Sequence, residues 1–354
     1  MKMSKYDLVA PSSMGVRITP EGFRPVHIAQ NYFMHATSAE SNVLNIPASL
    51  GMKTKVLTAF VKDSPIAAFI KNELSRRHIE YEGPDIAQDG PWGLRHQFNI
   101  ADSGYGARGP RVWNDRAGEV GRMLESGFYD LDRLFTADGV RIIHMSGLIA
   151  ALSPQTAAFC MELARLAHGA GTKVCFDLNY RASFWKGREK ELRDAFSAIA
   201  AAADILVGNE EDFQLALGIS GPKGDEKGLS GKTESFKTVI SDAEKRYPNV
   251  SVFATTLREA IDANRHMWGA VMLAEGQWHE APPREISVLD RIGGGDAFVS
   301  GLLYGILKGC GYEDCIRLGW AGGAMAVTAW EDYASPADEE ALWSIWNGNA
   351  RVRR

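Results

Sequence analysis

Three consecutive glycines followed by an aspartate, Gly293-Gly294-Gly295-Asp296, are the residues best suited to chemistry in this chain. Apolar residues recur at helical spacing from Phe298 to Lys308, which predicts a helix that begins at this turn and ends before Gly309. Glycines before a helix let backbone N–H groups converge, and the helix N-terminus adds partial positive charge, so the turn suits an anion such as a phosphoryl group. Asp296 would repel a bound anion, but it could take a proton from an attacking hydroxyl. A helix-capping role for Asp296 is the alternative.

Polar residues elsewhere could act beside this turn. Arg181, in Asp177-Leu178-Asn179-Tyr180-Arg181, could grip a carboxylate or phosphate as a planar fork, or could form an ordinary surface salt bridge. The run Asn209-Glu210-Glu211-Asp212 could hold Mg²⁺ through water, or could complement a helix dipole. Arg116 could likewise bind an anion or be a solvated loop charge.

The second half of the chain alternates between apolar strand-like and helix-like segments. Predicted strands cover 141–145, 173–178, 204–207, 250–255 and 267–273, and predicted helices cover 153–168, 189–203 and 210–217. This alternation implies a parallel sheet with helices on both faces, and sites in such sheets gather at the carboxyl ends of strands. We therefore expect residues 177–179, 209–210 and 255–256 to lie near the glycine turn.

The first half is less regular. A strand is predicted at 6–10, and extended pieces at 16–18, 25–30, 93–100 and 111–113 could pair as a small separate sheet. Thr37-Ser38-Ala39-Glu40 reads as a capping box that starts a helix to Leu50, with a kink at Pro47. Residues 220–235 predict a surface loop, and 313–330 predict a helix of small residues, suited to tight packing or to an adjacent ligand.

Composition excludes several classes of function. A chain of 354 residues with 45% hydrophobic and 23% charged residues is typical of a soluble globular protein. Its net charge of −5 argues against nucleic acid as the main partner. Transmembrane and signal-peptide patterns are absent, so we expect no membrane association and a cytoplasmic location. Four cysteines without a CxxC pair favour reduced core thiols over a metal site: Cys160, Cys175, Cys310 and Cys315.

The stretch Asp290-Arg291-Ile292-Gly293-Gly294-Gly295-Asp296, followed by Ala297-Phe298, resembles the C-terminal signature of the ribokinase-like (phosphofructokinase-B type) carbohydrate kinases. The residues of this motif are most similar to those of the 2-keto-3-deoxygluconate kinase branch. The resemblance implies one α/β domain over residues 1–354, with a three-layer α/β/α fold, a mostly parallel central sheet and a small β-sheet lid from about 14–34 and 92–114. It also implies that Asp296 is the catalytic base, that Gly293 to Gly295 form the anion hole, and that ATP and Mg²⁺ are required.

The same resemblance assigns binding roles to other positions. Residues implied at the sugar are Thr37, Ser38, Asn42, Asn114, Arg116, Arg181 and Asp296. Residues implied at the nucleotide are Asn179, Arg181, Asn209, Thr255, Leu257, Arg258, Gly293, Gly295 and Ala324. Asn209 and Asp212 are implied at Mg²⁺, through water. Relatives often pair through their lids, so a homodimer is implied as well.

This chain departs from the family in its first half. Thr37-Ser38 stand where relatives usually carry Gly-Gly, Ser12-Ser13 replace Gly-Glu, and Asn114 replaces a tyrosine. Two arginines, Arg116 and Arg181, could meet one anionic substrate, which favours a sugar acid.

We therefore predict an ATP-dependent sugar kinase acting on a sugar acid, with 2-keto-3-deoxygluconate as first candidate. The alternatives are a related kinase for fructose, ribose or a nucleoside, and a non-catalytic sugar- or nucleotide-binding homologue. A dehydrogenase is disfavoured because the glycine run lacks a spaced third glycine and lies late in the chain.

Overall fold

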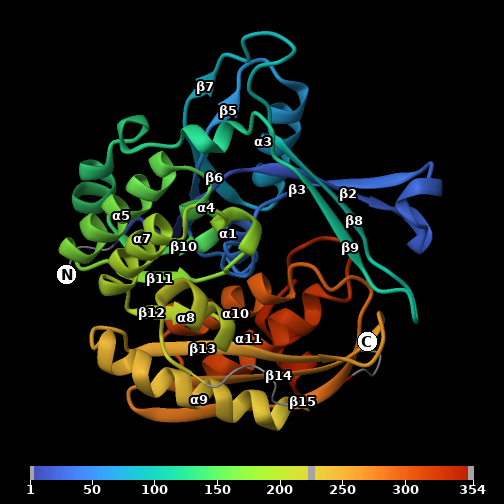
Figure 1. Ribbon diagram of the computed structural model, residues 1–354, viewed down its shortest axis with the longest axis vertical. Coiled ribbons are helices and arrows are strands. Elements are labelled where there is room, and N and C mark those ends of the chain that lie inside the picture. The colour runs from blue at the N-terminus through green and yellow to red at the C-terminus, as the bar shows by residue number, and fades with distance from the viewer. Residues whose placement is uncertain (1–3, 222–227, 350–354) are drawn as a thin grey trace.

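The computed structural model describes residues 4–221 and 228–349 and is built around one large sheet (Figure 1). Its strands are β1 (Tyr6–Pro11), β4 (Thr54–Leu57), β6 (Ile79–Glu82), β10 (Val140–Ser146), β11 (Lys173–Asp177), β12 (Ile205–Val207), β13 (Val252–Ala260), β14 (Arg265–Ala274) and β15 (Gln277–Ser287). The spatial order is β15-β14-β13-β12-β11-β10-β1-β4-β6. Pairing is parallel from β13 to β6 and antiparallel from β13 to β15.

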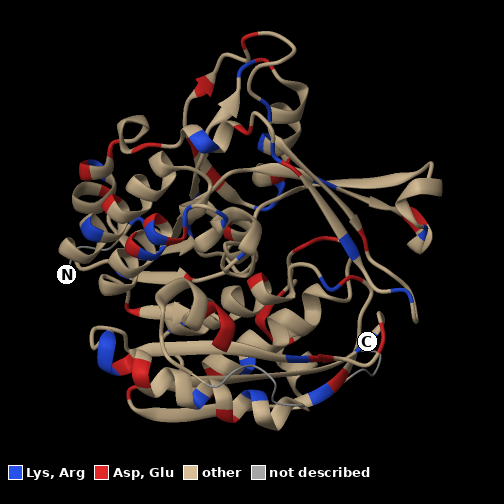
Figure 2. Ribbon diagram, in the orientation of Figure 1, with Lys and Arg blue, Asp and Glu red and all other residues tan. Residues whose placement is uncertain are grey.

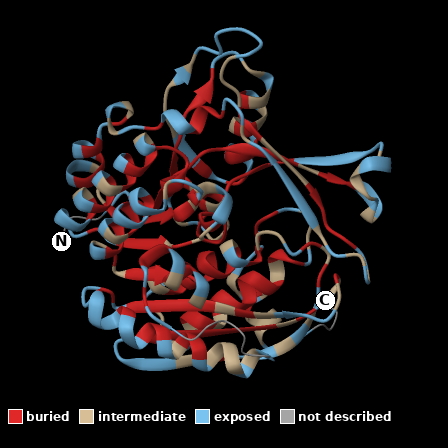
Figure 3. Ribbon diagram, viewed as in Figure 1, coloured by how far each residue is buried: buried red, intermediate tan, exposed pale blue. Residues whose placement is uncertain are grey.

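Helices cover both faces of this sheet and bury two apolar clusters against it. One face carries α4 (Gly147–Ala151), α5 (Pro154–Gly169), α6 (Ala182–Trp185), α7 (Glu189–Ala201), α8 (Glu210–Leu217) and α9 (Gly228–Arg246). The other carries α1 (Ala39–Val43), α2 (Asn45–Ser49), α3 (Pro65–Arg76), α10 (Gly294–Lys308), α11 (Tyr312–Ala326) and α12 (Glu339–Trp346). The central strands are almost wholly buried (Figure 3), as expected for a parallel sheet between helices.

A smaller four-stranded sheet projects from this body (Figure 1). It consists of β3 (Tyr32–Thr37), β2 (Gly15–Pro20), β8 (Gln97–Asp102) and β9 (Arg111–Asp115), in the order β3-β2-β8-β9. The pair β2–β8 is parallel, and the two outer pairs are antiparallel. A two-stranded pair, β5 (Phe60–Val61) with β7 (Asp85–Ile86), lies apart from both sheets. We call the four-stranded unit the small sheet.

One extended segment that was predicted for the small sheet is not a strand. Pro25 to Gln30 was predicted to be extended because Val26 and Ile28 alternate, but Val26–Ile28 is one 3-10 turn, and β3 begins only at Tyr32. The strand that pairs with β2 is therefore the following segment.

The helix predicted from Thr37 to Leu50 is two short helices. Ser38, not Thr37, is the N-cap, and its Oγ accepts a hydrogen bond from the backbone N–H of Ser41 at 3.1 Å. The helical path breaks at Leu44, three residues before the predicted kink, because Pro47 has no N–H to donate to the carbonyl of Val43.

Two further segments differ from the prediction. The strand predicted to end at Thr255 continues to Ala260 and forms a long hairpin with β14. The predicted loop 220–235 is a helix from Gly228 onward, while 222–227 lie outside the described residues.

The small residues of α10 and α11 serve close packing. A Cβ on Gly301 would lie 2.3 Å from the carbonyl oxygen of Leu318, and one on Gly323 would lie 2.4 Å from the ring of Trp268. The structure thus supports the tight-packing interpretation of α11, and this packing fixes α10 and the glycine turn at its start.

Lys and Arg residues are interspersed with Asp and Glu residues along the helices and loops seen in Figure 2. Among the helices of the described residues, none is long and apolar enough to cross a membrane.

Candidate active site

The glycine turn forms the N-terminus of α10. Gly293 is the N-cap residue with φ 81°, a conformation that favours glycine. A Cβ there would also lie 1.8 Å from the carbonyl oxygen of Asp332, which packs directly against the turn. Gly294 and Gly295 occupy the first turn, where backbone N–H groups have no partner within the helix. A Cβ on Gly295 would meet no atom within 4 Å, so the turn is open at this residue, whereas Gly294 is buried.

Asp296 lies in the first turn of α10, beside those donors. The amide of Asn42 on α1 donates a hydrogen bond to Asp296 Oδ2 at 2.9 Å. Desolvation raises the pKa of Asp296 well above its ordinary value, and the nearby charges of Asp177, Asp332 and Glu40 act in the same direction. A carboxylate with raised proton affinity, held in place by an amide, is a suitable proton acceptor.

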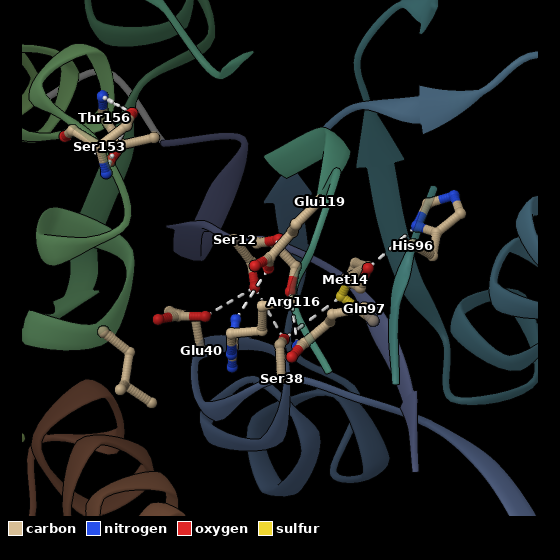
Figure 4. Close-up of polar contacts among 12 residues, drawn as sticks. Ser12, Met14, Ser38, Glu40, His96, Gln97, Arg116, Glu119, Ser153 and Thr156 are labelled. Atoms are coloured by element: carbon tan, nitrogen blue, oxygen red, sulfur yellow. Dashed lines mark hydrogen bonds and ion pairs between the residues drawn. The ribbon is translucent and has the colours of Figure 1, made fainter. Parts of the chain in front are cut away.

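A buried network of hydroxyl groups and a carboxylate lies on the small-sheet side of Asp296. Ser12 Oγ is 2.7 Å from both Ser38 Oγ and Glu40 Oε2 (Figure 4). Ser146 also donates to Glu40. Desolvation raises the pKa of Glu40, although the hydroxyls of Ser146 and Ser12 oppose this. Because the carboxylate of Glu40 accepts hydrogen bonds from these two serines, it does not form the predicted capping box.

A pocket opens beside this network. Its wall combines residues from the small sheet, from the loops beside it and from α1 with apolar residues of α4 and its C-terminus: Ser13, Ser38, Ala39, Glu40, Gln97, Arg116, Leu148, Ile149 and Leu152. Arg116 follows β9 and donates to Glu119 Oε1 at 2.8 Å, so that Glu40 and Glu119 flank it (Figure 4). Ser13 also donates to Glu119.

Arg116 and Arg181 make different contacts. The guanidinium carbon of Arg116 lies 5.4 Å from the centre of the Phe184 ring, and the Phe184 N–H donates to the carbonyl of Arg181 at 2.9 Å. Arg181 is exposed, and its charge opposes the rise in pKa that desolvation causes in Asp177 and Asp212. Arg116 lines the pocket, whereas the Arg181 side chain donates a hydrogen bond to the carbonyl of Tyr180 at 2.7 Å.

The other residues predicted at the sugar are placed differently. Thr37 is buried and donates to Asp332 Oδ2 at 2.6 Å, so its hydroxyl is directed toward the loop behind Gly293. Asn114 lies exposed within β9, opposite Asn99, and is not among the residues that line the pocket. Asn42 and Ser38 remain close to Asp296 and to the pocket, respectively.

The predicted nucleotide residues lie around the carboxyl ends of β11, β12 and β13. Thr255 is the first residue of β13 beyond its parallel pairing with β12, which ends at Ala254. Leu257 is buried and Arg258 partly buried on the extension that follows. Burial and the charge of Arg291 lower the pKa of Arg258 to about 10. Ala324 is buried in α11.

Sequence comparison decides the family. The profile described as pfkB family carbohydrate kinase matches residues 18–338. This chain belongs to the pfkB family of carbohydrate kinases. It is accordingly an ATP-dependent phosphotransferase that acts on small carbohydrate molecules.

Individual pfkB relatives cover nearly the whole chain. The 2-dehydro-3-deoxygalactonokinase of Haloferax volcanii is 25% identical over 98% of this chain and 99% of its own length. The 2-dehydro-3-deoxygluconokinase of Bacillus subtilis is 25% identical over 93% and 92%. The solved structure of 2-dehydro-3-deoxygluconokinase from Thermotoga maritima has a TM-score of 0.86 at 24% identity, covering 97% of this chain and 98% of that one. The ribokinase-like fold follows from this likeness.

The acidic groups of this pfkB kinase offer Mg²⁺ an outer contact rather than a cage of carboxylates. Both oxygens of Asp212 accept backbone N–H groups, from Tyr180 at 3.0 Å and from Asn209 at 2.9 Å. Asn209 in turn caps α8. The buried Oδ1 of Asn179, next to Asp177, lacks a partner and could accept from a water on Mg²⁺. Among the described residues, groups of three or more His, Cys, Asp or Glu side chains suited to a metal are absent.

Asp177 makes folding of the kinase pH-dependent. Desolvation, helped by Asp212, raises its pKa from 3.8 to about 7. Between these values the folded chain binds a proton that the unfolded chain has released, so stability decreases as pH rises through this window. Asp177→Asn is expected to remove a slope of at most about 1.4 kcal/mol per pH unit, measured by urea unfolding. Equal slopes in both proteins would contradict this assignment.

Several residues around the site were missed by sequence reasoning. Glu40 was interpreted as a helix cap, and Glu119 and Gln97 lie in segments without a motif. Arg17 on β2 forms buried ion pairs with Asp290 and Asp332. Of these residues, Arg17 alone could have been identified from the sequence, because it is a charged residue between Val16 and Ile18 in an extended apolar segment.

Proposed function

We propose that this pfkB kinase transfers the γ-phosphoryl group of ATP to a hydroxyl of a sugar acid, with 2-keto-3-deoxygluconate as the first candidate. The observation that carries the proposal is the position of Asp296. Its carboxylate lies in the first turn of α10, whose backbone N–H groups have no partner within the helix, and it accepts a hydrogen bond from Asn42 on α1.

In this mechanism Asp296 accepts the proton of the attacking hydroxyl. The N–H groups from Gly293 to Gly295 donate to the transferring phosphoryl group, whose charge increases as the bond to ADP breaks. Mg²⁺, when bound with ATP, neutralises phosphate charge, and Asn179, Asn209 and Asp212 would contact its waters. Arg258 supplies positive charge on the nucleotide side.

Arg116 and Arg181 support an acidic acceptor. Arg116 lines the pocket that contains Glu40 and Ser38 and lies over the Phe184 ring, and Arg181 precedes Phe184 by three residues. Arg181 is exposed and makes its side-chain hydrogen bond to a backbone carbonyl, so its guanidinium keeps donors for a carboxylate. Several relatives are named for keto-deoxy sugar acids, which agrees with this choice.

One observation favours a neutral sugar instead. Arg116 is already paired with Glu119, and Glu40 lies on its other side, so the charge of Arg116 is compensated within the protein. A neutral hexose or pentose would need only the hydroxyl and amide groups of this pocket.

The test is ADP release from ATP and Mg²⁺ with a panel of acceptors. The panel contains 2-keto-3-deoxygluconate, its galactonate epimer, fructose, ribose and a nucleoside. Turnover confined to the sugar acids supports the proposal. Turnover with a neutral sugar alone contradicts the sugar-acid assignment, and binding of ATP without turnover on any acceptor contradicts catalysis.

Arg181→Met separates the two acceptor classes. Loss of a hydrogen bond to a charged group is expected to raise KM for the sugar acid roughly 10- to 100-fold, while kcat changes little. Arg193→Met, which replaces another exposed arginine, is the control. An unchanged KM for the sugar acid would remove Arg181 from the acceptor site.

We also propose that two copies pair through their small sheets, which then cover the acceptor pockets as lids. Exposed apolar residues on this sheet support the pairing: Phe33, Met34, Val112 and Trp113. Analytical ultracentrifugation of Phe33→Glu against the wild type tests it, and an unchanged mass would oppose it.

The consumption of ATP and the four free cysteines support a cytoplasmic location, which cell fractionation tests.

A further inference from the structure

Arg17 is the largest fully buried side chain of the described residues, with 1% of its surface exposed. It lies on β2 of the small sheet and forms ion pairs with Asp290 and Asp332, both of which are also buried. Although burial opposes ionisation, Arg17 holds the pKa of Asp332 far below its usual range. A buried charged group of this kind is a weak source of stability, so its position calls for another explanation.

Both carboxylates hold the glycine turn. Asp290 begins the turn, and its Oδ1 accepts the backbone N–H of Ile292 at 3.0 Å. Asp332 lies on the opposite side, where its carbonyl oxygen packs against Gly293 so closely that a Cβ could not be placed there. Arg17 therefore joins the two backbone segments that enclose the start of α10.

Other residues connect the small sheet to the same two carboxylates. Ser103, just after β8, donates to Asp290 Oδ2 at 2.6 Å, and Thr37 at the end of β3 donates to Asp332 Oδ2 at 2.6 Å. His35 Nε2 lies 3.4 Å from Asp332 Oδ1. Three strands of the small sheet thus meet the turn here, but Arg17 alone, within residues 4–221 and 228–349, forms ion pairs with both acids.

We propose that Arg17 is a positioning residue, which holds the N–H groups of Gly293 to Gly295 in their catalytic arrangement when the small sheet is seated on the body. The inference rests on the proposed function, because it assigns those N–H groups to the transferring phosphoryl group. It extends that function because the ion pairs of Arg17 would couple the position of the small sheet to the position of the anion hole.

The experiment compares Arg17→Ala and Arg17→Lys with the wild type. Removal of the guanidinium is expected to lower kcat about 100-fold, as for loss of an anion-hole donor, with little change in KM for ATP. Lysine keeps the charge but cannot donate to two carboxylates as the planar guanidinium does, so the decrease in kcat is expected to be smaller in Arg17→Lys than in Arg17→Ala. Adding guanidinium ion to Arg17→Ala is expected to restore part of the lost activity, whereas sodium at equal ionic strength is not.

Amide hydrogen exchange supplies a readout that is independent of the acceptor. Exchange within residues 290–296 is expected to be faster in both variants, while exchange in the central strands stays unchanged. Arg24→Ala, which replaces an exposed arginine before β3, is the matched control. Where Arg17→Ala does not fold, Arg17→Lys decides.

The outcomes separate the two proposals. Wild-type kcat together with wild-type exchange in the folded variants would overturn the positioning role. A parallel loss of kcat and of exchange protection throughout the chain would also overturn it, because that pattern indicates a purely structural role. Faster exchange at 290–296 in a protein that turns over none of the panel would keep the role of Arg17 in holding the turn and reject the proposed catalysis.

Discussion

Asp296→Asn is expected to lower kcat about 1,000-fold, because general-base catalysis is lost while the shape of the site is retained. The asparagine oxygen can still accept the hydrogen bond that Asn42 now donates to Asp296. The expected result is therefore a folded protein that binds ATP with nearly unchanged affinity. Steady-state ADP release and equilibrium nucleotide binding measure the two quantities separately.

The pH profile gives a second view of the same residue. Desolvation raises the pKa of Asp296, and only the deprotonated form accepts a proton, so kcat/KM is expected to fall as the solution becomes acidic. The fall is expected nearer neutral pH than for an ordinary aspartate. Asp194→Asn, on an exposed face of α7, is the matched control and is expected to show wild-type rates. Wild-type activity in Asp296→Asn would exclude Asp296 as the base.

Gly293→Ala is expected to abolish most activity and to destabilise the fold. A side chain at φ 81° costs roughly 1–3 kcal/mol by itself. The new Cβ would also lie 1.8 Å from the carbonyl oxygen of Asp332, which cannot move without moving the buried ion pair to Arg17. Thermal unfolding of the variant should therefore start well below that of the wild type.

Gly295→Ala is the contrasting variant. Its Cβ would meet no protein atom within 4 Å, and its φ is not in the left-handed region, so the melting temperature is expected to be nearly unchanged. The methyl group instead enters the space before the helix N-terminus, where the phosphoryl group is proposed to bind. We expect kcat to fall about 100-fold. A stable and fully active Gly295→Ala would move the anion site away from this turn.

Local sequence patterns were sufficient for the parts of this kinase that depend on contiguous residues. The glycine turn, α10 and its end at Gly309 follow from spacing and from glycine chemistry. Strands such as β10 and β11 follow from short apolar runs between helices. Asn42, which donates to Asp296, was singled out only because a family motif reached that far.

Contacts between distant segments could not be predicted in this way. The role of Thr37 depends on Asp332, which is 295 positions away and lies in a segment without periodicity. The extension of β13 beyond Ala254 is stabilised by its hairpin with β14. This pairing depends on a second segment, so the strand propensity of the residues alone does not predict it. Glu40 carries a motif that suggests a cap, but two strand-end serines provide better partners for its carboxylate.

The buried hydroxyl network has an evolutionary consequence. Ser38 caps α1 and also meets Ser12, whose hydroxyl in turn meets Glu40. Substituting glycine at Ser38 alone would remove the cap and leave Ser12 with one partner fewer in a dry environment. We therefore expect these positions to be epistatic, so that the effect of each substitution depends on the residue at the others. Redesign of the pocket beside this network therefore calls for changing Ser12, Ser38 and Glu40 together.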